Sequence, residues 1–346
     1  METRPLGRSG LEVSALCLGT MTWGEQNTQD EAFEQMDFAC DRGINFFDAA
    51  EMYPVSPREE TYGRTEEIIG NWFASRGQRE RVIVATKVVG PGNRFPYIRD
   101  GQPRLNREHI LQACDDSLRR LQTDYIDLYQ LHWPERSANF FGDLAYKPDP
   151  DEDAVPLEET LGALGELVEA GKVRHVGVSN ETAWGLMKYL NLADAGGGPR
   201  MVSIQNPYSL LNRSFEVGLA EVAVREDCGL LAYAPIAAGA LTGKYLGGRK
   251  PEGARMTLFP ENTRYFTEQG IAATEEYVAL AKQHGIGPSV MAGAFVYSRP
   301  FLTASIVGAT KMEQLELQLQ AAETRLPQEL LDGIEEIHRR YTYPCP

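Results

Sequence analysis

The sequence is poor in cysteine and in basic residues. Its five cysteines, Cys17, Cys40, Cys114, Cys228 and Cys345, are scattered and lack the close pairs that metal sites and disulfide frameworks use. Asp and Glu number 49 against 34 Lys and Arg, and the formal net charge of −15 disfavours nucleic acid and anionic membranes as partners. We therefore expect a cytoplasmic protein in which any anionic ligand needs a local basic pocket.

The sequence also lacks the marks of several other classes. No stretch approaches the roughly 20 apolar residues of a membrane helix, and residues 1–13 lack the apolar core of a signal peptide. No GxGxxG motif follows the first expected strand, and the five histidines show no zinc-ligand spacing, so we expect neither a Rossmann domain nor a metal site. The remaining class is a globular protein of average composition, 42% hydrophobic and 24% charged.

Short β-branched apolar runs alternate with amphipathic stretches along most of the chain, which indicates parallel strands joined by crossover helices. The expected strands are 15–19, 44–49, 81–87, 125–132, 173–179, 201–205, 229–233 and 304–308. Expected helices include 28–42, 66–75, 107–121, 157–170, 181–192, 215–226 and 274–284. Eight such units predict an α/β protein with a (β/α)8 TIM barrel, in one domain of residues 1–346.

The segments outside this repeat have their own expected places. Residues 1–11 could form a hairpin at the barrel bottom, with turn chemistry from Gly7 to Gly10. Three long loops, 88–106, 133–156 and 247–269, follow strands and are expected at the C-terminal face, where the active sites of this fold lie. Most of the expected strands end in a polar residue. Burying a polar group without a hydrogen-bond partner costs free energy, so a shared pocket at these strand ends is the simplest explanation.

Four of these residues could carry acid–base chemistry. Asp48, Lys87 and His132 end three successive expected strands, and Tyr53 lies in the loop after the first of them. Reduction of a carbonyl by hydride transfer leaves negative charge on the oxygen, which needs a donor that also gives up a proton. A neighbouring ammonium favours a phenolate, so we expect Lys87 to bring the pKa of Tyr53 closer to operating pH, with Asp48 holding Lys87 and His132 positioning the substrate oxygen.

Each residue alone could be structural, as a buried ion pair, a core histidine or a loop tyrosine. Several ordered motifs make that reading less favourable. They are LGTMTWGE (18–25), GINFFDAAEMY (43–53), ATK (85–87), YIDLYQLHWP (125–134), GKVRHVGVSNET (171–182), IQNPYSLLNR (204–213), YAPIAAGALTGKY (233–245) and IVGAT (306–310). With them the chain resembles the aldo-keto reductases over essentially its whole length, most closely the bacterial Tas-like branch. The resemblance implies a catalytic tetrad of Asp48, Tyr53, Lys87 and His132.

The resemblance also implies an NADP(H) site. Ser179, Asn180 and Gln205 would bind the nicotinamide carboxamide, and the ring of Tyr233 would stack on the nicotinamide. The other implied cofactor positions are Gly19, Thr20, Met21, Gln26, Asp48, Ala234, Pro235, Ile236, Ala237, Ala238, Gly239, Ala240, Leu241, Lys244, Arg255, Gly308, Thr310, Lys311, Gln314 and Gln318. Lys311, at an expected helix start that suits a 2′-phosphate, is the reason to expect NADPH rather than NADH.

Some alternatives stay open. Asn180 and Gln205 could cap helices, and Tyr233 could be barrel packing. The chain departs from its channel-associated relatives at Leu317 and Gln318, where they carry Glu and Asn, which puts the usual adenine contacts in doubt. Ala234 stands where Ser is common, and this removes one hydroxyl available to a phosphate.

The expected function is NADPH-dependent reduction of small aldehydes and ketones. Trp23, Trp133 and Phe141 would make the substrate pocket aromatic, and Tyr53 and His132 would hold the carbonyl oxygen. The alternative is a redox-sensing, cofactor-binding interaction subunit with little turnover. Channel-associated relatives often carry Asn in place of the histidine, so His132 favours the enzyme, as does the lack of an extra N-terminal docking segment.

Overall fold

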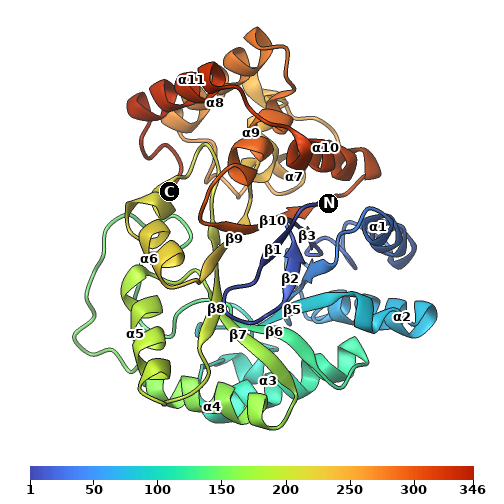
Figure 1. The fold of residues 1–346 in the computed structure, drawn as a ribbon, viewed down its shortest axis with the longest axis vertical. Coiled ribbons are helices and arrows are strands. Elements are labelled where there is room, and N and C mark those ends of the chain that lie inside the picture. The colour runs from blue at the N-terminus through green and yellow to red at the C-terminus, as the bar shows by residue number, and fades with distance from the viewer.

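The computed structural model describes residues 1–346, which form a closed barrel of eight parallel strands surrounded by helices (Figure 1). The barrel strands are β3 (Leu16–Gly19), β4 (Phe46–Asp48), β5 (Ile83–Val88), β6 (Ile126–Leu131), β7 (Val173–Ser179), β8 (Met201–Pro207), β9 (Gly229–Tyr233) and β10 (Leu302–Gly308). They follow the order of the chain around the ring, and β10 pairs with β3 to close it. The predicted TIM barrel is confirmed, with all eight strands at their expected places.

The helices of the chain are α1 (Gln29–Asp41), α2 (Arg64–Arg76), α3 (Arg107–Leu121), α4 (Leu157–Glu169), α5 (Ala183–Asp194), α6 (Leu219–Arg225), α7 (Arg255–Leu258), α8 (Glu268–Gln283), α9 (Pro288–Tyr297), α10 (Met312–Glu323) and α11 (Gln328–Arg340). The continuous helix expected over 215–226 is wrong. A short 3-10 helix, Ser214–Val217, is separated from α6 by a break at Gly218, where the backbone leaves helical angles.

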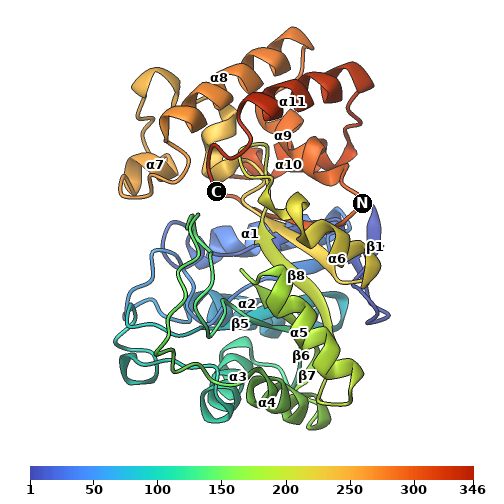
Figure 2. The same cartoon turned by 90° about the vertical axis from the view of Figure 1, so that its left-hand side faces the viewer.

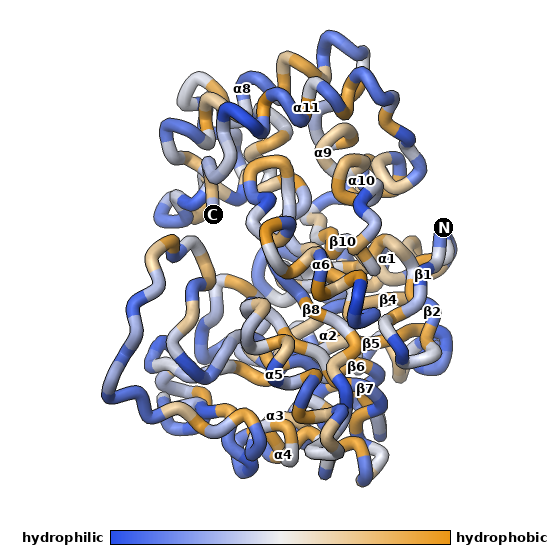
Figure 3. Tube along the Cα trace, turned by 60° about the vertical axis from the view of Figure 1, so that its left-hand side comes forward, coloured by the Kyte–Doolittle hydropathy of each residue, from blue (hydrophilic) through white to orange (hydrophobic).

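Three helices lie outside those expected. The four-residue α7 falls inside the loop expected over 247–269, and α9 and α11 escape prediction for different reasons. Eight of the ten residues of α9 are buried, so its sequence shows no polar face and no amphipathic period. The period of α11 is clear, with Leu330, Ile334 and Ile337 buried on one face, but it follows the last barrel strand and stands outside the eightfold repeat. Figure 3 shows hydrophobic and hydrophilic segments alternating along α8 and α11.

The N-terminal hairpin closes one end of the barrel. Strands β1 (Thr3–Pro5) and β2 (Glu12–Ser14) pair antiparallel, as predicted, and lie across the barrel in Figure 1. Leu6 and Val13 are fully buried against barrel residues that include Cys17 and Phe46. Gly7 has φ +54°, and a Cβ there would lie 2.4 Å from the Val202 carbonyl oxygen, so the turn needs glycine.

The opposite end carries the long loops. Figure 2 shows these loops and α7 on one side of the molecule, with β1 on the other. The carboxyl ends of all eight strands therefore open toward the loops. The longest helix, α8, has 16 residues, and no helix combines the length and apolar character required to cross a bilayer.

Candidate active site

A buried ion pair lies at the carboxyl ends of β4 and β5. Lys87 is fully buried, and its Nζ donates to Asp48 Oδ2 at 2.6 Å and to the Ala49 carbonyl oxygen at 2.7 Å. Asp48 Oδ1 accepts a hydrogen bond from Gln205 Nε2 at 2.8 Å. A buried lysine needs this degree of compensation because an unpaired ammonium away from water costs several kcal/mol, on the order of a lost ion pair.

Tyr53 and His132 complete the cluster. The Tyr53 hydroxyl lies 3.4 Å from Lys87 Nζ, and the Tyr53 and His132 rings meet edge to face with centroids 5.9 Å apart. His132 follows β6 and is 8% exposed, while Tyr53 is partly exposed. The structure thus brings together four residues that are spread over 85 positions of sequence, from three strand ends and one loop.

The charge states of these groups follow from burial. Burial raises the pKa of Tyr53 above its usual value of 10.0, and the Lys87 charge opposes this rise only in part. The prediction that Lys87 lowers the pKa of Tyr53 below its usual value is therefore wrong for the protein without a bound cofactor. Desolvation of the phenolate outweighs the effect of the nearby ammonium. Burial and then Lys87 lower the pKa of His132 well below 6.5, so its imidazole is neutral at neutral pH.

Four polar side chains are hydrogen-bonded to one another or to neighbouring backbone at the carboxyl ends of β7, β8 and β9. Asn180 Nδ2 donates to the His132 carbonyl oxygen at 2.9 Å, and the Tyr233 hydroxyl donates to Asn180 Oδ1 at 2.8 Å. Ser179 Oγ donates to the Gln205 carbonyl oxygen at 2.8 Å. Gln205 uses its amide nitrogen for Asp48 and Gln130, which leaves its Oε1 without a protein donor. The four residues expected at the nicotinamide therefore lie side by side next to the ion pair.

The segment after β9 has a strained backbone. Ala234, Ala237 and Ala238 have φ of 55°, 51° and 52°, and Gly239 has φ 90°. Left-handed alanines cost about 1–2 kcal/mol each. Within 234–241, the expected positions Pro235, Ala237, Gly239, Ala240 and Leu241 are buried, and Ala234, Ile236 and Ala238 are partly exposed. The Lys244 side chain lies against Gly239. A Cβ added to Gly239 would lie only 3.1 Å from Lys244 Nζ.

Most of the remaining expected cofactor residues follow β3 and β10, which are neighbours in the ring, and Arg255 lies in α7 after β9. Thr20 Oγ1 donates to the Asp48 carbonyl oxygen at 2.8 Å, next to Gly19 and Met21. Gln26 Oε1 lies 3.5 Å from an Arg255 nitrogen. After Gly308, the backbone N–H of Thr310 donates to Gln314 Oε1 at 3.0 Å, and exposed Lys311 stands at the start of α10. Lys244, Arg255 and Lys311 form no salt bridge, unlike most arginines of the chain.

Aromatic rings line the mouth beside His132. The Trp133 ring lies 5.0 Å from His132, 6.1 Å from Phe141 and 6.5 Å from Phe95, measured between centroids. The Trp133 indole N–H donates to the Pro91 carbonyl oxygen, which fixes the ring between two of the long loops. Phe141 is 44% exposed, so this aromatic wall opens toward solvent.

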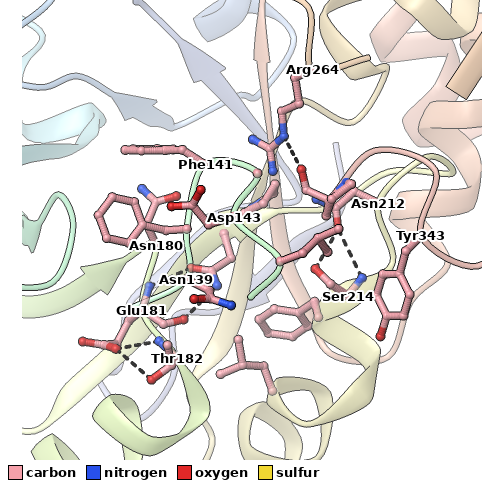
Figure 4. Close-up of a pocket in the computed structure, with 18 residues that line it drawn as sticks. Asn139, Phe141, Asp143, Asn180, Glu181, Thr182, Asn212, Ser214, Arg264 and Tyr343 are labelled. Carbon is pink, nitrogen blue, oxygen red and sulfur yellow. Dashed lines mark hydrogen bonds between the residues drawn. The ribbon is translucent and has the colours of Figure 1, made fainter. Parts of the chain in front are cut away.

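Beside this wall lies a cavity of about 430 Å³ (Figure 4). It is bounded by Asn139–Leu144 of the long loop, by the ends of β7 and β8, and by Tyr343 and Pro346 of the C-terminal segment. Asn180, Asn206 and Asn212 give it a polar lining, and Arg264 supplies a positive charge. No group of three His, Cys, Asp or Glu residues is arranged to hold a metal ion.

Comparison with known proteins decides the family. The model of the Aldo/keto reductase family matches residues 15–339, which is nearly the whole chain. The chain belongs to the aldo/keto reductase family.

The similarity to several relatives of this aldo/keto reductase covers all or nearly all of both chains. Protein tas of Escherichia coli is 53% identical over 100% of both chains. An uncharacterized oxidoreductase of Bacillus subtilis, YrpG, is 36% identical over 97% of this chain and 96% of its own. A candidate voltage-gated potassium channel subunit beta of Schizosaccharomyces pombe is 32% identical over 96% of this chain and 92% of its own. The expected Tas-like membership is confirmed, and the protein is an oxidoreductase of this family.

Two expected site residues are buried in this reductase. Trp23 is fully buried in the core, and its indole N–H donates to Gln35 Oε1 at 3.1 Å, so it does not line the mouth. Gln318 is 3% exposed and packs toward Gly293 of α9, with its Oε1 unpartnered. The motif containing Trp23 and the helical position of Gln318 gave no information on which way either side chain turns.

The sequence reasoning also missed Glu51. This fully buried carboxylate accepts bonds from two Arg99 nitrogens at 2.9 and 2.7 Å, from the Val89 N–H at 2.5 Å and from the Tyr62 hydroxyl at 3.0 Å. It therefore ties the loop that carries Tyr53 to the loop after β5. The only signal in the sequence is a second acidic residue three positions after Asp48 in the DAAEMY motif.

Proposed function

We propose that this protein reduces aldehydes and ketones to alcohols with NADPH, using Tyr53 as the proton donor. The observation that carries the proposal is the buried Asp48–Lys87 pair, with Lys87 Nζ 3.4 Å from the Tyr53 hydroxyl and the His132 ring beside it. A phenol next to an ammonium can release a proton to an oxygen on which negative charge develops. A structural ion pair alone would not need a partly exposed tyrosine and a histidine beside it.

The residues around the pair suit a nicotinamide dinucleotide. Gln205 Oε1, Asn180 and Ser179 offer the amide and hydroxyl groups that complement a carboxamide, and Tyr233 offers an aromatic plane. The cofactor, when bound, supplies a hydride to the carbonyl carbon. Lys244, Arg255 and Lys311 lack carboxylate partners and could neutralise its phosphates, which would otherwise be repelled by a chain of net charge −15. Lys311 at the start of α10 supports NADPH over NADH.

In this proposal each side chain has one task. Tyr53 gives its proton to the carbonyl oxygen as the alcohol forms, and Lys87 stabilises the phenolate that remains until solvent returns a proton. Asp48 keeps Lys87 charged and oriented, because burial pulls the pKa of Lys87 down while Asp48 and Tyr53 together raise it above 10.5. Neutral His132 donates a hydrogen bond to the same oxygen without competing for the proton.

The test uses purified protein, NADPH and a reactive aldehyde such as methylglyoxal or 4-nitrobenzaldehyde, with NADPH oxidation followed by absorbance. We expect Tyr53→Phe to lower kcat by about 10²–10⁴-fold, because general acid catalysis contributes on that order. NADPH affinity should stay within about twofold, since the hydroxyl carries no cofactor contact in this proposal. Equal rates in the wild type and the variant would end the assignment of Tyr53.

A second candidate function is a redox-sensing subunit with little turnover, which the channel-subunit relative supports. It predicts tight NADPH binding, slow turnover with every aldehyde, and co-purification of a membrane partner. The presence of His132 beside Tyr53 favours the enzyme, because a sensor needs no group to position a reacting oxygen. A turnover above about 1 per second with any small carbonyl decides for the enzyme.

A further inference from the structure

Gln130 is a fully buried polar side chain inside the barrel. It lies on β6, two residues after Leu128, just as Asp48 follows Phe46 by two residues on β4. Leu128 and Phe46 belong to the apolar cluster on which the N-terminal hairpin packs inside the barrel. Side chains two positions apart on a strand point to the same side, so Gln130 and Asp48 both face the barrel interior.

Gln130 belongs to a layer of three polar side chains. The strands β4, β6 and β8 alternate with β5 and β7 around the ring, and alternate strands supply the side chains of one layer in this fold. Gln130 Nε2 donates to Asp48 Oδ1 at 3.3 Å, and Gln205 Nε2 donates to Gln130 Oε1 at 3.2 Å. With the 2.8 Å bond from Gln205 to Asp48, the three side chains close a triangle of hydrogen bonds.

The charge of Asp48 sets the orientation of both amides. Asp48 is paired with Lys87 Nζ at 2.6 Å, and a carboxylate accepts hydrogen bonds but donates none. Each glutamine must therefore turn its NH2 group, and not its carbonyl oxygen, toward Asp48. For Gln205 this leaves Oε1 free to accept a hydrogen bond from a ligand.

Gln130 gives the Gln205 amide a second point of attachment. The NH2 group of Gln205 has two protons, of which one goes to Asp48 Oδ1 and the other to Gln130 Oε1. An amide held by one hydrogen bond can rotate about it, whereas two bonds from the same nitrogen fix the plane of the amide. The direction in which Gln205 Oε1 points therefore depends on Gln130.

A purely structural role explains this glutamine poorly. The interior layers of such barrels are usually filled by branched apolar side chains, and burying an amide costs free energy unless its hydrogen bonds compensate. Both bonds of Gln130 are longer than 3.0 Å, so they add little to what an apolar side chain of the same shape would provide. A polar residue at this position is better explained by the site that it adjoins.

We propose that Gln130 is a positioning residue that acts through Gln205. It holds Gln205 Oε1 in the direction in which this oxygen accepts a hydrogen bond from the NH2 group of the nicotinamide carboxamide. This rests on the proposed function, which places the nicotinamide beside Gln205. Selectivity for a carboxamide on the cofactor ring then depends on a residue that does not contact the cofactor.

The experiment compares NADP⁺ with its 3-acetylpyridine analogue, in which a methyl group replaces the carboxamide NH2 and the carbonyl oxygen is kept. The quantity is the ratio of the two Kd values, measured by calorimetry without a carbonyl substrate. We expect the wild type to bind NADP⁺ about 10-fold more tightly than the analogue, because the analogue leaves Gln205 Oε1 without a donor. Gln130→Met keeps the shape of the side chain and should reduce this preference to about threefold or less.

A double-variant cycle tests whether Gln130 acts through Gln205. Gln205→Met should abolish the preference, and adding Gln130→Met to it should change the ratio no further. Ser203→Ala is the matched control, because Ser203 is buried on β8 two residues before Gln205 and its hydroxyl has no partner. In turnover assays, Gln130→Met should raise KM for NADPH and leave kcat at saturating NADPH within about threefold, since Lys87 and Gln205 still hold Asp48.

Several outcomes would overturn the inference. They are a wild type without preference between the two ligands, an unchanged ratio in Gln130→Met, and the same effect of Gln130→Met with and without Gln205. A Gln130→Met protein that does not fold, or that binds both ligands equally weakly with a lowered thermal midpoint, would show that the role of Gln130 is structural. NADP⁺ binding with a ratio independent of Gln130 rejects only this inference, whereas no binding of either ligand rejects the proposed function as well.

Discussion

At the scale of single residues, burial decides how the candidate site titrates. The Tyr53 phenol loses hydration in the barrel mouth, and this effect outweighs the ammonium 3.4 Å away. His132 shows the same effect with the opposite sign, since burial disfavours its charged form. The positions of Lys87 and Tyr53 at and after strand ends correctly predicted that the two side chains meet. The loss of hydration at each group, which sets the direction of its pKa shift, depends on the folded chain and could not be predicted in that way.

This gives a prediction for the pH dependence of reduction. Tyr53 must be protonated to act, so activity is lost only as the pH rises through its pKa, which burial places above 10.0. His132 stays neutral throughout the neutral range. We expect kcat with saturating NADPH to vary by less than about twofold between pH 6.5 and 9. A fall in kcat with a midpoint near pH 7 to 8 would show that Lys87 controls the phenol after all.

The Asp48–Lys87 pair allows stability to be separated from catalysis. Lys87→Met leaves a buried carboxylate without its cation, and we expect a loss of about 3–5 kcal/mol in the free energy of unfolding, measured with urea. The double variant Asp48→Asn/Lys87→Met should recover most of that stability and none of the turnover. Recovery of turnover in the double variant would contradict the role of Lys87 beside the phenol.

At the scale of elements, the loops around the site are tied together by buried polar contacts. Glu51 joins the Tyr53 loop to Arg99, and Arg99 belongs to the loop after β5. Trp133 reaches the same loop through the Pro91 carbonyl oxygen. The site is therefore held by contacts between loops as well as by the strand ends.

Glu51→Gln tests this. A buried carboxylate with a bidentate arginine becomes a neutral amide and leaves Arg99 unpaired, so we expect a loss of about 3–5 kcal/mol in unfolding free energy, together with a lower kcat. Glu67→Gln, which removes an exposed partner of Arg64, is the matched control and should cost under about 1 kcal/mol. Similar losses in the two variants would show that the Glu51 contact does not hold the loop.

Sequence patterns predicted helices and strands well where the hydrophobic period was regular. They predicted them poorly where tertiary packing or the backbone angles determined the structure. The strand ends that deliver Asp48, Lys87 and His132 were assigned from apolar runs, because parallel strands buried on both faces leave that mark. The fully buried α9 left no amphipathic period, and the break at Gly218 needed the folded backbone to become visible. Trp23 and Gln318 were placed by position alone, and packing turned both side chains inward.

At the scale of the whole molecule, cofactor binding should appear as stability. A ligand that binds only the folded state at 100 times its Kd adds about 2.7 kcal/mol. We expect NADPH to raise the thermal midpoint more than NADH does at equal concentration, and Lys311→Gln to reduce the difference. Equal shifts with the two cofactors in the wild type would contradict the preference for NADPH.

The pairing of β10 with β3 joins residues 302–308 to residues 16–19, near opposite ends of the chain. During synthesis the ring stays open until its final strand has left the ribosome, and the free edges of β3 and β9 can pair with other chains in the meantime. A nascent chain can therefore hold every residue of the Asp48–Lys87–Tyr53–His132 cluster and still lack a finished wall around it. Catalytic competence should arise late and abruptly, so a fragment ending before residue 302 is expected to aggregate rather than to retain partial activity.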